Sequence, residues 1–166
     1  MTNQKGIKRP LLSARLRERA QNIVEFAIAA PVFLSMVIGI FEFSRMVFVL
    51  ASVYTAAREA TRYALPITTG TPPYLDCAGI RQEAKNHGWP GAVVDADVLI
   101  TYDSGPETAT IGSCPVSAGS IHTGDRIIVQ VTGHFTPAGF VPLFEFPTFN
   151  IVATNRRTLL KEVTIP

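Results

Sequence analysis

The longest apolar run of the chain lies near its N-terminus. No residue from Phe26 to Phe41 carries a formal charge, and the apolar character extends from Ile23 to Leu50 if three charged residues are tolerated, namely Glu25, Glu42 and Arg45. A helix needs roughly 20 apolar residues to cross a bilayer. The pattern therefore predicts one membrane-spanning helix.

Beyond Glu42 the apolar residues recur at spacings of three and four, which is typical of one face of a helix. This predicted stripe consists of Phe43, Met46, Val47, Leu50, Val53, Tyr54, Ala57 and Thr61. Nothing from Gly39 to Leu65 would break a helix, whereas Pro66 lacks a backbone donor and ends it. We therefore expect one helix over residues 21–65, roughly 67 Å long at about 1.5 Å per residue.

A helix of that length exceeds the thickness of a bilayer, so only its first half is expected to lie in lipid. The second half then carries an apolar stripe that must be covered by protein. Two coverings fit the pattern: the downstream part of the same chain, and the helices of neighbouring subunits.

Three residues within the apolar half affect how the helix can pack. Pro31 removes a backbone hydrogen bond to residue 27, so we expect a kink or a local loosening there. Ser35 and Gly39 form a pair of small residues four apart, which permits close approach of a second helix.

The charges favour one orientation of this helix. Residues 1–20 contain six basic residues against Glu18 alone: Lys5, Lys8, Arg9, Arg15, Arg17 and Arg19. Lys and Arg are enriched on the cytoplasmic side of membrane helices, so residues 1–20 are expected to be a basic cytoplasmic leader. The hydrophobic content of 47% and the mean hydropathy of +0.24 fit one membrane element plus one small domain.

A cleaved secretory signal peptide is the main alternative for the N-terminal region, because it also combines positive charge with an apolar run. Ala27-Ile28-Ala29 resembles a cleavage site, but cleavage there would leave only Ile23–Ile28 as the apolar core. That core is too short, and the apolar run continues well past the site. A lipoprotein is disfavoured as well, since the first cysteine is Cys77.

Residues 66–166 are expected to form a small periplasmic or extracellular domain, rich in strands. The opening stretch is rich in turn formers, and Asp76 is a candidate cap for a short helix over residues 78–87. Alternation predicts strands over residues 93–102, 126–135 and, more weakly, 151–163, with a long loop between the first two. The predicted fold class is α+β, a pilin-like long helix followed by a small antiparallel sheet.

Cys77 and Cys114 are the only cysteines, and both fall on the outer side of the membrane according to the charge argument. Oxidation is permitted there, so we expect one disulfide between them, with two unpaired thiols or an intermolecular bridge as the alternatives. An intramolecular bridge would stabilise this domain by up to roughly 4 kcal/mol.

Five phenylalanines crowd a short stretch with three prolines. The phenylalanines are Phe135, Phe140, Phe144, Phe146 and Phe149. We expect them to cover the sheet or to pack on the long helix, and a surface for a partner or a membrane is the alternative.

No catalytic motif is present in the sequence: it has no CxxC pair, HExxH, P-loop, GxGxxG or GxSxG. The three histidines (His87, His122 and His134) lack zinc-ligand spacing, and Asp95, Asp97 and Asp103 do not form a calcium loop. The basic leader abuts a membrane helix and lacks interleaved aromatic residues, which argues against nucleic-acid binding. We therefore expect a protein without enzymatic activity, cofactor or metal.

Glu25 needs an explanation, because an ionisable residue in a spanning segment costs about 2.5–3.5 kcal/mol at the helix centre and less near the interface. One reading is that its carboxylate reaches the headgroups and pairs with Arg17 or Arg19. The other is that it has a role in assembly.

The residues around Glu25 favour the second reading through a resemblance. AQNIVEFAIAAPVFLSMVIGIFEFSR over residues 20–45, with AAREATRYA over residues 56–64, resembles the TadE-like family of minor pseudopilins of the tight-adherence (Flp) pilus system. The resemblance covers residues 20–64 and is diffuse beyond them.

The resemblance implies cleavage by a prepilin peptidase between Ala20 and Gln21, on the cytoplasmic side of the inner membrane. Ala20 keeps the small size of the glycine that family members usually have there. The resemblance also implies that Glu25 acts in assembly and that the partners are other pilins and pseudopilins of the Tad machinery. The alternative is an uncleaved periplasmic accessory or binding protein that stays permanently anchored in the membrane.

Overall fold

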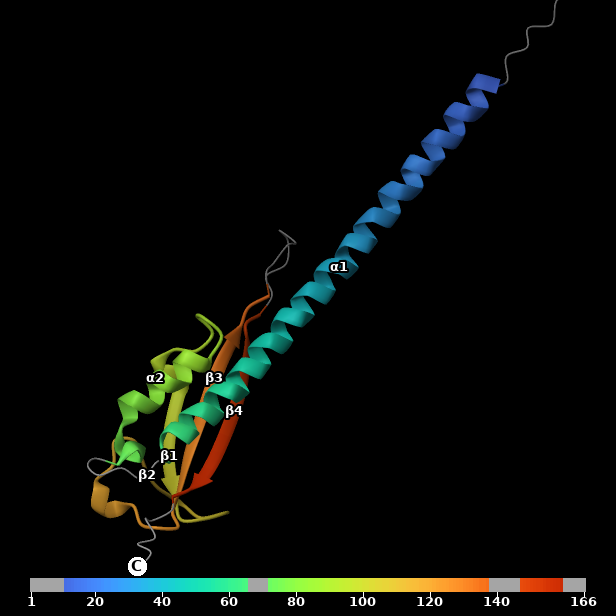
Figure 1. The fold of residues 1–166 in the computed structure, drawn as a ribbon. Helices are drawn as coiled ribbons and strands as arrows, with labels where there is room; N and C mark the ends of the chain where they lie inside the picture. The colour runs from blue at the N-terminus through green and yellow to red at the C-terminus, as the bar shows by residue number, and fades with distance from the viewer. Residues whose placement is uncertain (1–10, 66–71, 138–146, 160–166) are drawn as a thin grey trace, which may run out of the picture. The chain divides into compact units, whose positions relative to one another are not determined.

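A computed structural model describes residues 11–65, 72–137 and 147–159, and side chains from Ala20 onward. The chain divides into two compact units, Met1–Phe43 and Ser44–Pro166, which we call the first unit and the second unit. The order of the elements is α1 (Leu11–Tyr63), α2 (Cys77–His87), β1 (Val98–Asp103), β2 (Thr110–Ser113), β3 (Arg126–Phe135) and β4 (Phe149–Thr158), with short 3-10 turns between some of them (Figure 1). The predicted α+β class with an antiparallel sheet is confirmed.

Helix α1 begins at Leu11 instead of the expected Gln21 and ends at Tyr63, close to the expected Leu65. The earlier start has a simple cause: residues 11–20 are good helix formers with no proline or glycine among them. The helix also continues through Pro31. Of the described residues, the stretch Ala20–Tyr63 is long and apolar enough to cross a membrane.

The sheet has the strand order β2-β1-β3-β4, and every neighbouring pair is antiparallel. Strand β3 occupies the range predicted by its strong alternation, residues 126–135. It pairs with β4 over ten consecutive residues, from Arg126 opposite Thr158 to Phe135 opposite Phe149. This pairing sets β4 at Phe149–Thr158, earlier than the expected 151–163, whose last four residues lie outside the described part of the chain.

The structure differs from the prediction at the start of β1 and in the loop that follows it. Strand β1 begins at Val98 instead of Val93, because residues 95–97 form a 3-10 turn in which the Val94 amide donates to Asp97 Oδ2 at 2.8 Å. The region expected to be a long loop contains β2, which pairs with the end of β1. Most of its four residues are exposed, so it shows none of the alternation that identifies a half-buried strand.

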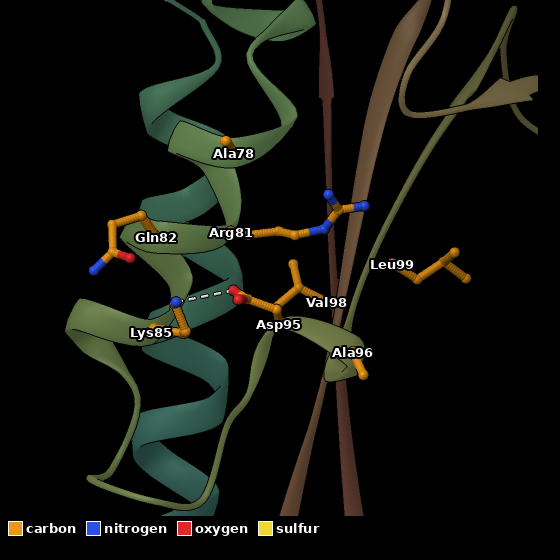
Figure 2. A pocket seen from close by; sticks show the side chains of 8 residues that line it. All are labelled: Ala78, Arg81, Gln82, Lys85, Asp95, Ala96, Val98 and Leu99. Atoms are coloured by element: carbon orange, nitrogen blue, oxygen red, sulfur yellow. Dashed lines mark ion pairs between the residues drawn. The ribbon is translucent and has the colours of Figure 1, made fainter.

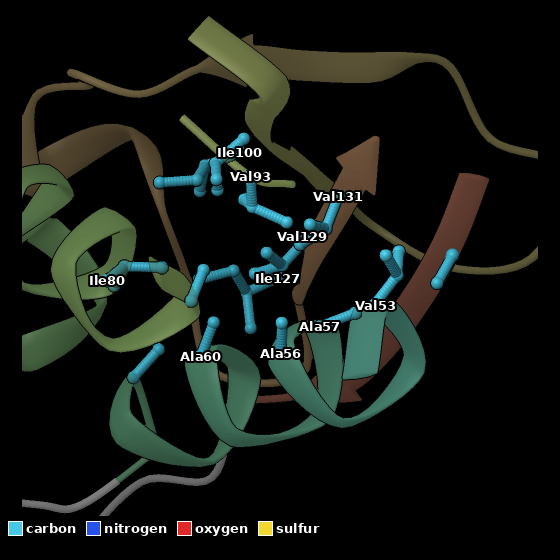
Figure 3. Close-up of a cluster of buried hydrophobic side chains, with 14 of the residues drawn as sticks. Val53, Ala56, Ala57, Ala60, Ile80, Val93, Ile100, Ile127, Val129 and Val131 are labelled. Atoms are coloured by element: carbon cyan, nitrogen blue, oxygen red, sulfur yellow. The ribbon is translucent and has the colours of Figure 1, made fainter. Parts of the chain in front are cut away.

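The core of the second unit lies on one face of the sheet. The buried residues alternate along the strands, as Val98, Ile100 and Tyr102 in β1 and Ile127, Val129 and Val131 in β3. Residues of α1 and α2 complete this core, and Figure 3 shows Val53, Ala56, Ala57, Ala60 and Ile80 lying with the β3 residues. Of the residues on the other face, Leu99 in β1 and Val152 in β4 are exposed, whereas those of β3 between Arg126 and Thr132 are half-buried.

The buried face of α1 differs in part from the predicted stripe. Val53, Ala57 and Thr61 are buried as expected, and Met46 is partly buried. Phe43, Val47, Leu50 and Tyr54 are exposed, whereas the core contains four residues absent from the prediction: Val49, Ala56, Ala60 and Ala64. The sheet lies against the smaller side chains because they allow a closer approach of the two backbones.

Gly133 in β3 shows how close this approach is. A Cβ atom at Gly133 would lie 2.3 Å from Cγ2 of Val53, which is far inside van der Waals contact. Glycine at this position therefore allows α1 and β3 to pack together.

Candidate functional site

Glu25 lies at one end of an apolar groove along the surface of α1. The other residues that line the groove are Ile28, Ala29, Val32, Phe33 and Met36, whose spacing places them on one side of the helix. Glu25 is the only ionisable residue among them. A carboxylate at the end of a strip of exposed apolar side chains can pair with a cation brought by a neighbouring chain while the strip packs against apolar surface.

Ala20 and Gln21, the predicted processing site, are both exposed on α1. The Ser35 hydroxyl donates to the Pro31 carbonyl at 2.7 Å, so the two residues interact within the helix. Nothing lies within 4 Å of a Cβ atom placed at Gly39. The Gly39 surface is therefore open in the single chain, and close packing of a second helix at Ser35 and Gly39 stays a prediction.

The predicted disulfide is confirmed between Cys77 and Cys114, with a Cα–Cα distance of 5.9 Å. Cys77 begins α2, and Cys114 directly follows β2, so the bond ties the helix to this edge of the sheet. Asp76 caps α2 as predicted, because its Oδ1 accepts from the Gly79 amide at 2.9 Å. These contacts also lower the pKa of Asp76, since the Gly79 amide stabilises the ionised carboxylate.

A buried tyrosine lies beside the disulfide. The Tyr102 hydroxyl donates to the Tyr74 carbonyl and lies 3.3 Å from Sγ of Cys114. Burial raises the pKa of Tyr102 to about 12, because the phenolate would lose its hydration. The phenol therefore stays neutral and serves as a hydrogen-bond donor within the core.

The three aspartates considered as calcium ligands each contact a basic side chain of the protein instead. Asp95 pairs with Lys85 at 2.9 Å, and Asp97 Oδ1 lies 2.9 Å from His134 Nε2. Asp103 accepts two hydrogen bonds of 2.7 Å from the Arg126 guanidinium, which lowers the pKa of the carboxyl. The three carboxylates therefore do not converge on one point.

The three histidines are likewise dispersed, each beside its own carboxylate. His87 lies near Glu83, His122 near Asp125 and His134 near Asp97. In the part of the chain that the structure describes, no group of three histidine, cysteine or acidic residues is placed to hold a metal ion.

A groove of about 630 Å³, not predicted from the sequence, lies between α2 and the start of β1. Its polar residues are Arg81, Gln82, Lys85 and Asp95, and its apolar residues are Ala78, Ala96, Val98 and Leu99 (Figure 2). Figure 2 shows Arg81 extending from α2 toward the strands, while Lys85 pairs with Asp95. The groove has one more cation than anion and could receive a single acidic group, but nothing in the sequence pattern distinguishes it from an ordinary solvated helix face.

A family model described as "TadE-like protein" matches residues 21–62, about a quarter of the chain. The chain matches no curated protein and no solved structure. The matched residues lie entirely within α1 and include Glu25, Pro31, Ser35 and Gly39. A TadE-like segment on an apolar helix fits a membrane protein associated with the Tad pilus. Residues 21–62 are therefore similar to the TadE-like family, as their motifs predicted.

Proposed function

We propose that this protein is a minor pseudopilin-like structural component of Tad/Flp pilus assembly that acts through protein–protein association and not through catalysis. The observation that carries the proposal is the TadE-like match over residues 21–62, on a helix whose exposed apolar groove ends at Glu25. In this proposal the N-terminus lies in the cytoplasm and the second unit in the periplasm, as the basic leader favours.

The exposed apolar side chains of α1 support an associating role. Val32, Met36 and Ile40 are exposed in the first unit, and the same spacing of three or four residues continues with Val47, Leu50 and Tyr54 in the second unit. Lipid can cover the first group. The second group follows the spanning segment, where water would otherwise hydrate it, so helices of neighbouring subunits are its proposed cover.

Glu25 would give this association its register. Cleavage between Ala20 and Gln21 by a prepilin peptidase would create an α-amine at Gln21, and the family match begins at that residue. In a staggered array of helices, the amine of one subunit can lie beside the Glu25 carboxylate of the next. Each charge then offsets the cost of burying the other, and the pair forms in only one register.

The proposed role of Glu25 can be tested with Glu25→Gln, which keeps the shape of the side chain and removes its charge. We expect normal insertion in the membrane and a strong loss of pili sheared from the cell surface. Glu59→Gln is the matched control, because Glu59 lies on the same helix and its ion pair is a weak one, at 3.5 Å from Arg62, whose side chain is 79% exposed. Wild-type pilus output from Glu25→Gln would remove the proposed role of this carboxylate.

Processing is tested separately by the intact mass of the protein from cells with and without their prepilin peptidase. We expect a chain that begins at Gln21 only when the peptidase is present. The alternative function, a permanently anchored periplasmic accessory or binding protein, takes its support from alanine at position 20, where family members usually have glycine. A full-length chain in both strains would favour that alternative.

A further inference from the structure

The turn that follows α2 holds the only tryptophan of the chain, Trp89, in a fixed backbone position. The Trp89 amide donates to Oγ of Ser52 on α1 at 3.1 Å, and the Trp89 carbonyl accepts from the Ala92 amide at 2.9 Å. Just before it, the Gly88 amide donates to the Ala84 carbonyl at 3.0 Å and ends α2. These bonds anchor the turn to both helices.

The indole of Trp89 is nevertheless turned outward. Trp89 is 47% exposed as a residue, and its neighbour Phe48 on α1 is 62% exposed, with the two ring centroids 6.4 Å apart. Among the described residues, the indole N–H has no hydrogen-bond partner. We call Phe48 and Trp89 the aromatic pair. A tryptophan with a well-fixed backbone and an exposed ring is suited to an environment that is apolar on one side and polar on the other.

The position of Phe48 along α1 indicates that this environment is the membrane–water interface. Roughly 20 residues cross the hydrocarbon, so a span that begins at Ile23 ends near Glu42. Phe48 follows Glu42 by six residues, which corresponds to about 9 Å of helix. Each headgroup layer is about 5–8 Å thick, so Phe48 falls at its outer boundary, and the larger Trp89 ring lies beside Phe48.

We propose that the aromatic pair docks the second unit on the headgroup layer of the bilayer from which α1 emerges. This proposal rests on the membrane anchoring contained in the proposed function. Tryptophan is enriched at membrane–water interfaces because its ring is apolar and its N–H can donate to lipid oxygens. The aromatic pair thus continues the lipid contact of the spanning segment.

The test uses the full chain in phosphatidylcholine vesicles whose lipids carry bromine either near the headgroup or near the terminal methyl. Bromine quenches tryptophan on contact, and Trp89 is the only tryptophan, so the wild-type protein needs no label. We expect a larger loss of Trp89 emission with the shallow bromines than with the deep ones, and weak quenching by iodide in the water.

Two variants calibrate the measurement. Each combines Trp89→Phe with a single new tryptophan at another position. Phe33→Trp places the probe in the apolar run, and we expect the deep bromines to quench it. Ala109→Trp places it at an exposed position between β1 and β2, near the opposite end of the sheet from Phe135, and we expect quenching by iodide alone.

The outcomes separate the proposals. Trp89 open to iodide and unaffected by either lipid would overturn the docking. Trp89 shielded from both iodide and bromine would overturn it as well, in favour of a neighbouring protein as the cover. If the Phe33→Trp probe is not quenched by lipid, the membrane anchoring itself fails, which is distinct from a failure confined to Trp89.

Discussion

Helix α1 contains two stretches that are both rich in apolar residues and differ in what covers them. In the first unit the large side chains point outward, as at Phe26, Phe33 and Ile40. In the second unit the covered face of the helix consists largely of alanine and valine, packed on β3 of the same chain. Both stretches are hydrophobic, so side-chain size is what distinguishes them. Small side chains lie where the helix packs on its own sheet, and large ones lie where lipid or another chain can cover them.

The same difference shows in the glycines. Gly39 in the first unit would tolerate a Cβ atom, because nothing lies within 4 Å, whereas Gly133 in the second unit has Val53 in that space. The side chains around Gly39 are therefore accessible to another molecule, whereas those around Gly133 are part of a packed core. Substitutions of buried residues in the second unit should lower its free energy of unfolding, and substitutions of exposed residues in the first unit should not.

The largest expected effect on the second unit comes from its disulfide. Replacing Cys77 and Cys114 together by serine opens a loop with a sequence separation of 37. In the chain-entropy model, this lowers the free energy of unfolding of the second unit by about 4 kcal/mol. Trp89 emission during urea unfolding in detergent measures the loss, and the wild type with a reductant is its control. Insertion of the first unit in membranes should not change; an unchanged urea midpoint would show that the bond contributes little.

A matched pair of valines on α1 tests the comparison directly. Val53→Ala removes two methyl groups from a fully buried side chain, so we expect a loss of about 2 kcal/mol in the free energy of unfolding of the second unit. Val32→Ala makes the same change at a side chain that is 60% exposed, and we expect no loss. The urea midpoint of each full-length variant decides. Equal shifts would mean that the two stretches of helix are not covered differently.

The elements that were predicted correctly are those whose sequence pattern allows only one structure. Strand β3 matched its predicted range, because strict alternation with one buried face allows only one register. The Asp76 cap and helix α2 followed from local chemistry. The short strand β2 did not, because most of its residues are exposed and its pairing with β1 leaves no alternation in the sequence.

The buried face of α1 was predicted only in part for a different reason. Apolar periodicity identified a stripe, but Phe43, Val47 and Leu50, which are exposed, are as apolar as the residues that the sheet covers. The useful signal was the repeat of alanine at positions 56, 60 and 64, which marks a face that another element can approach closely. The candidate site in the first unit was easier to find, since a lone carboxylate in an apolar run is visible without any tertiary information.

The smallest expected effect concerns the pH dependence of the second unit. His134 joins three segments: its Nε2 lies 2.9 Å from Asp97 Oδ1 beside β1, and its Nδ1 lies 2.8 Å from Asn150 Oδ1 on β4. The hydrogen bond to Asp97, followed by the one to Asn150, raises the pKa of His134 above its usual value. The protonated ring therefore stabilises the fold.

The direction of the effect follows from linkage. The stabilisation is complete below the unfolded-state pKa of about 6.5 and is lost as the pH rises through the higher folded-state pKa. Because the side chain is 44% exposed, we expect this stabilisation to be less than about 1 kcal/mol.

Urea midpoints from about pH 5 to pH 9 should fall in the wild type across this window and stay nearly flat in His134→Gln. His87→Gln is the control and should keep the wild-type slope, because the His87 side chain contacts only Glu83 of its own helix. An unchanged slope in His134→Gln would assign the pH dependence to another group and leave His134 as an ordinary surface residue.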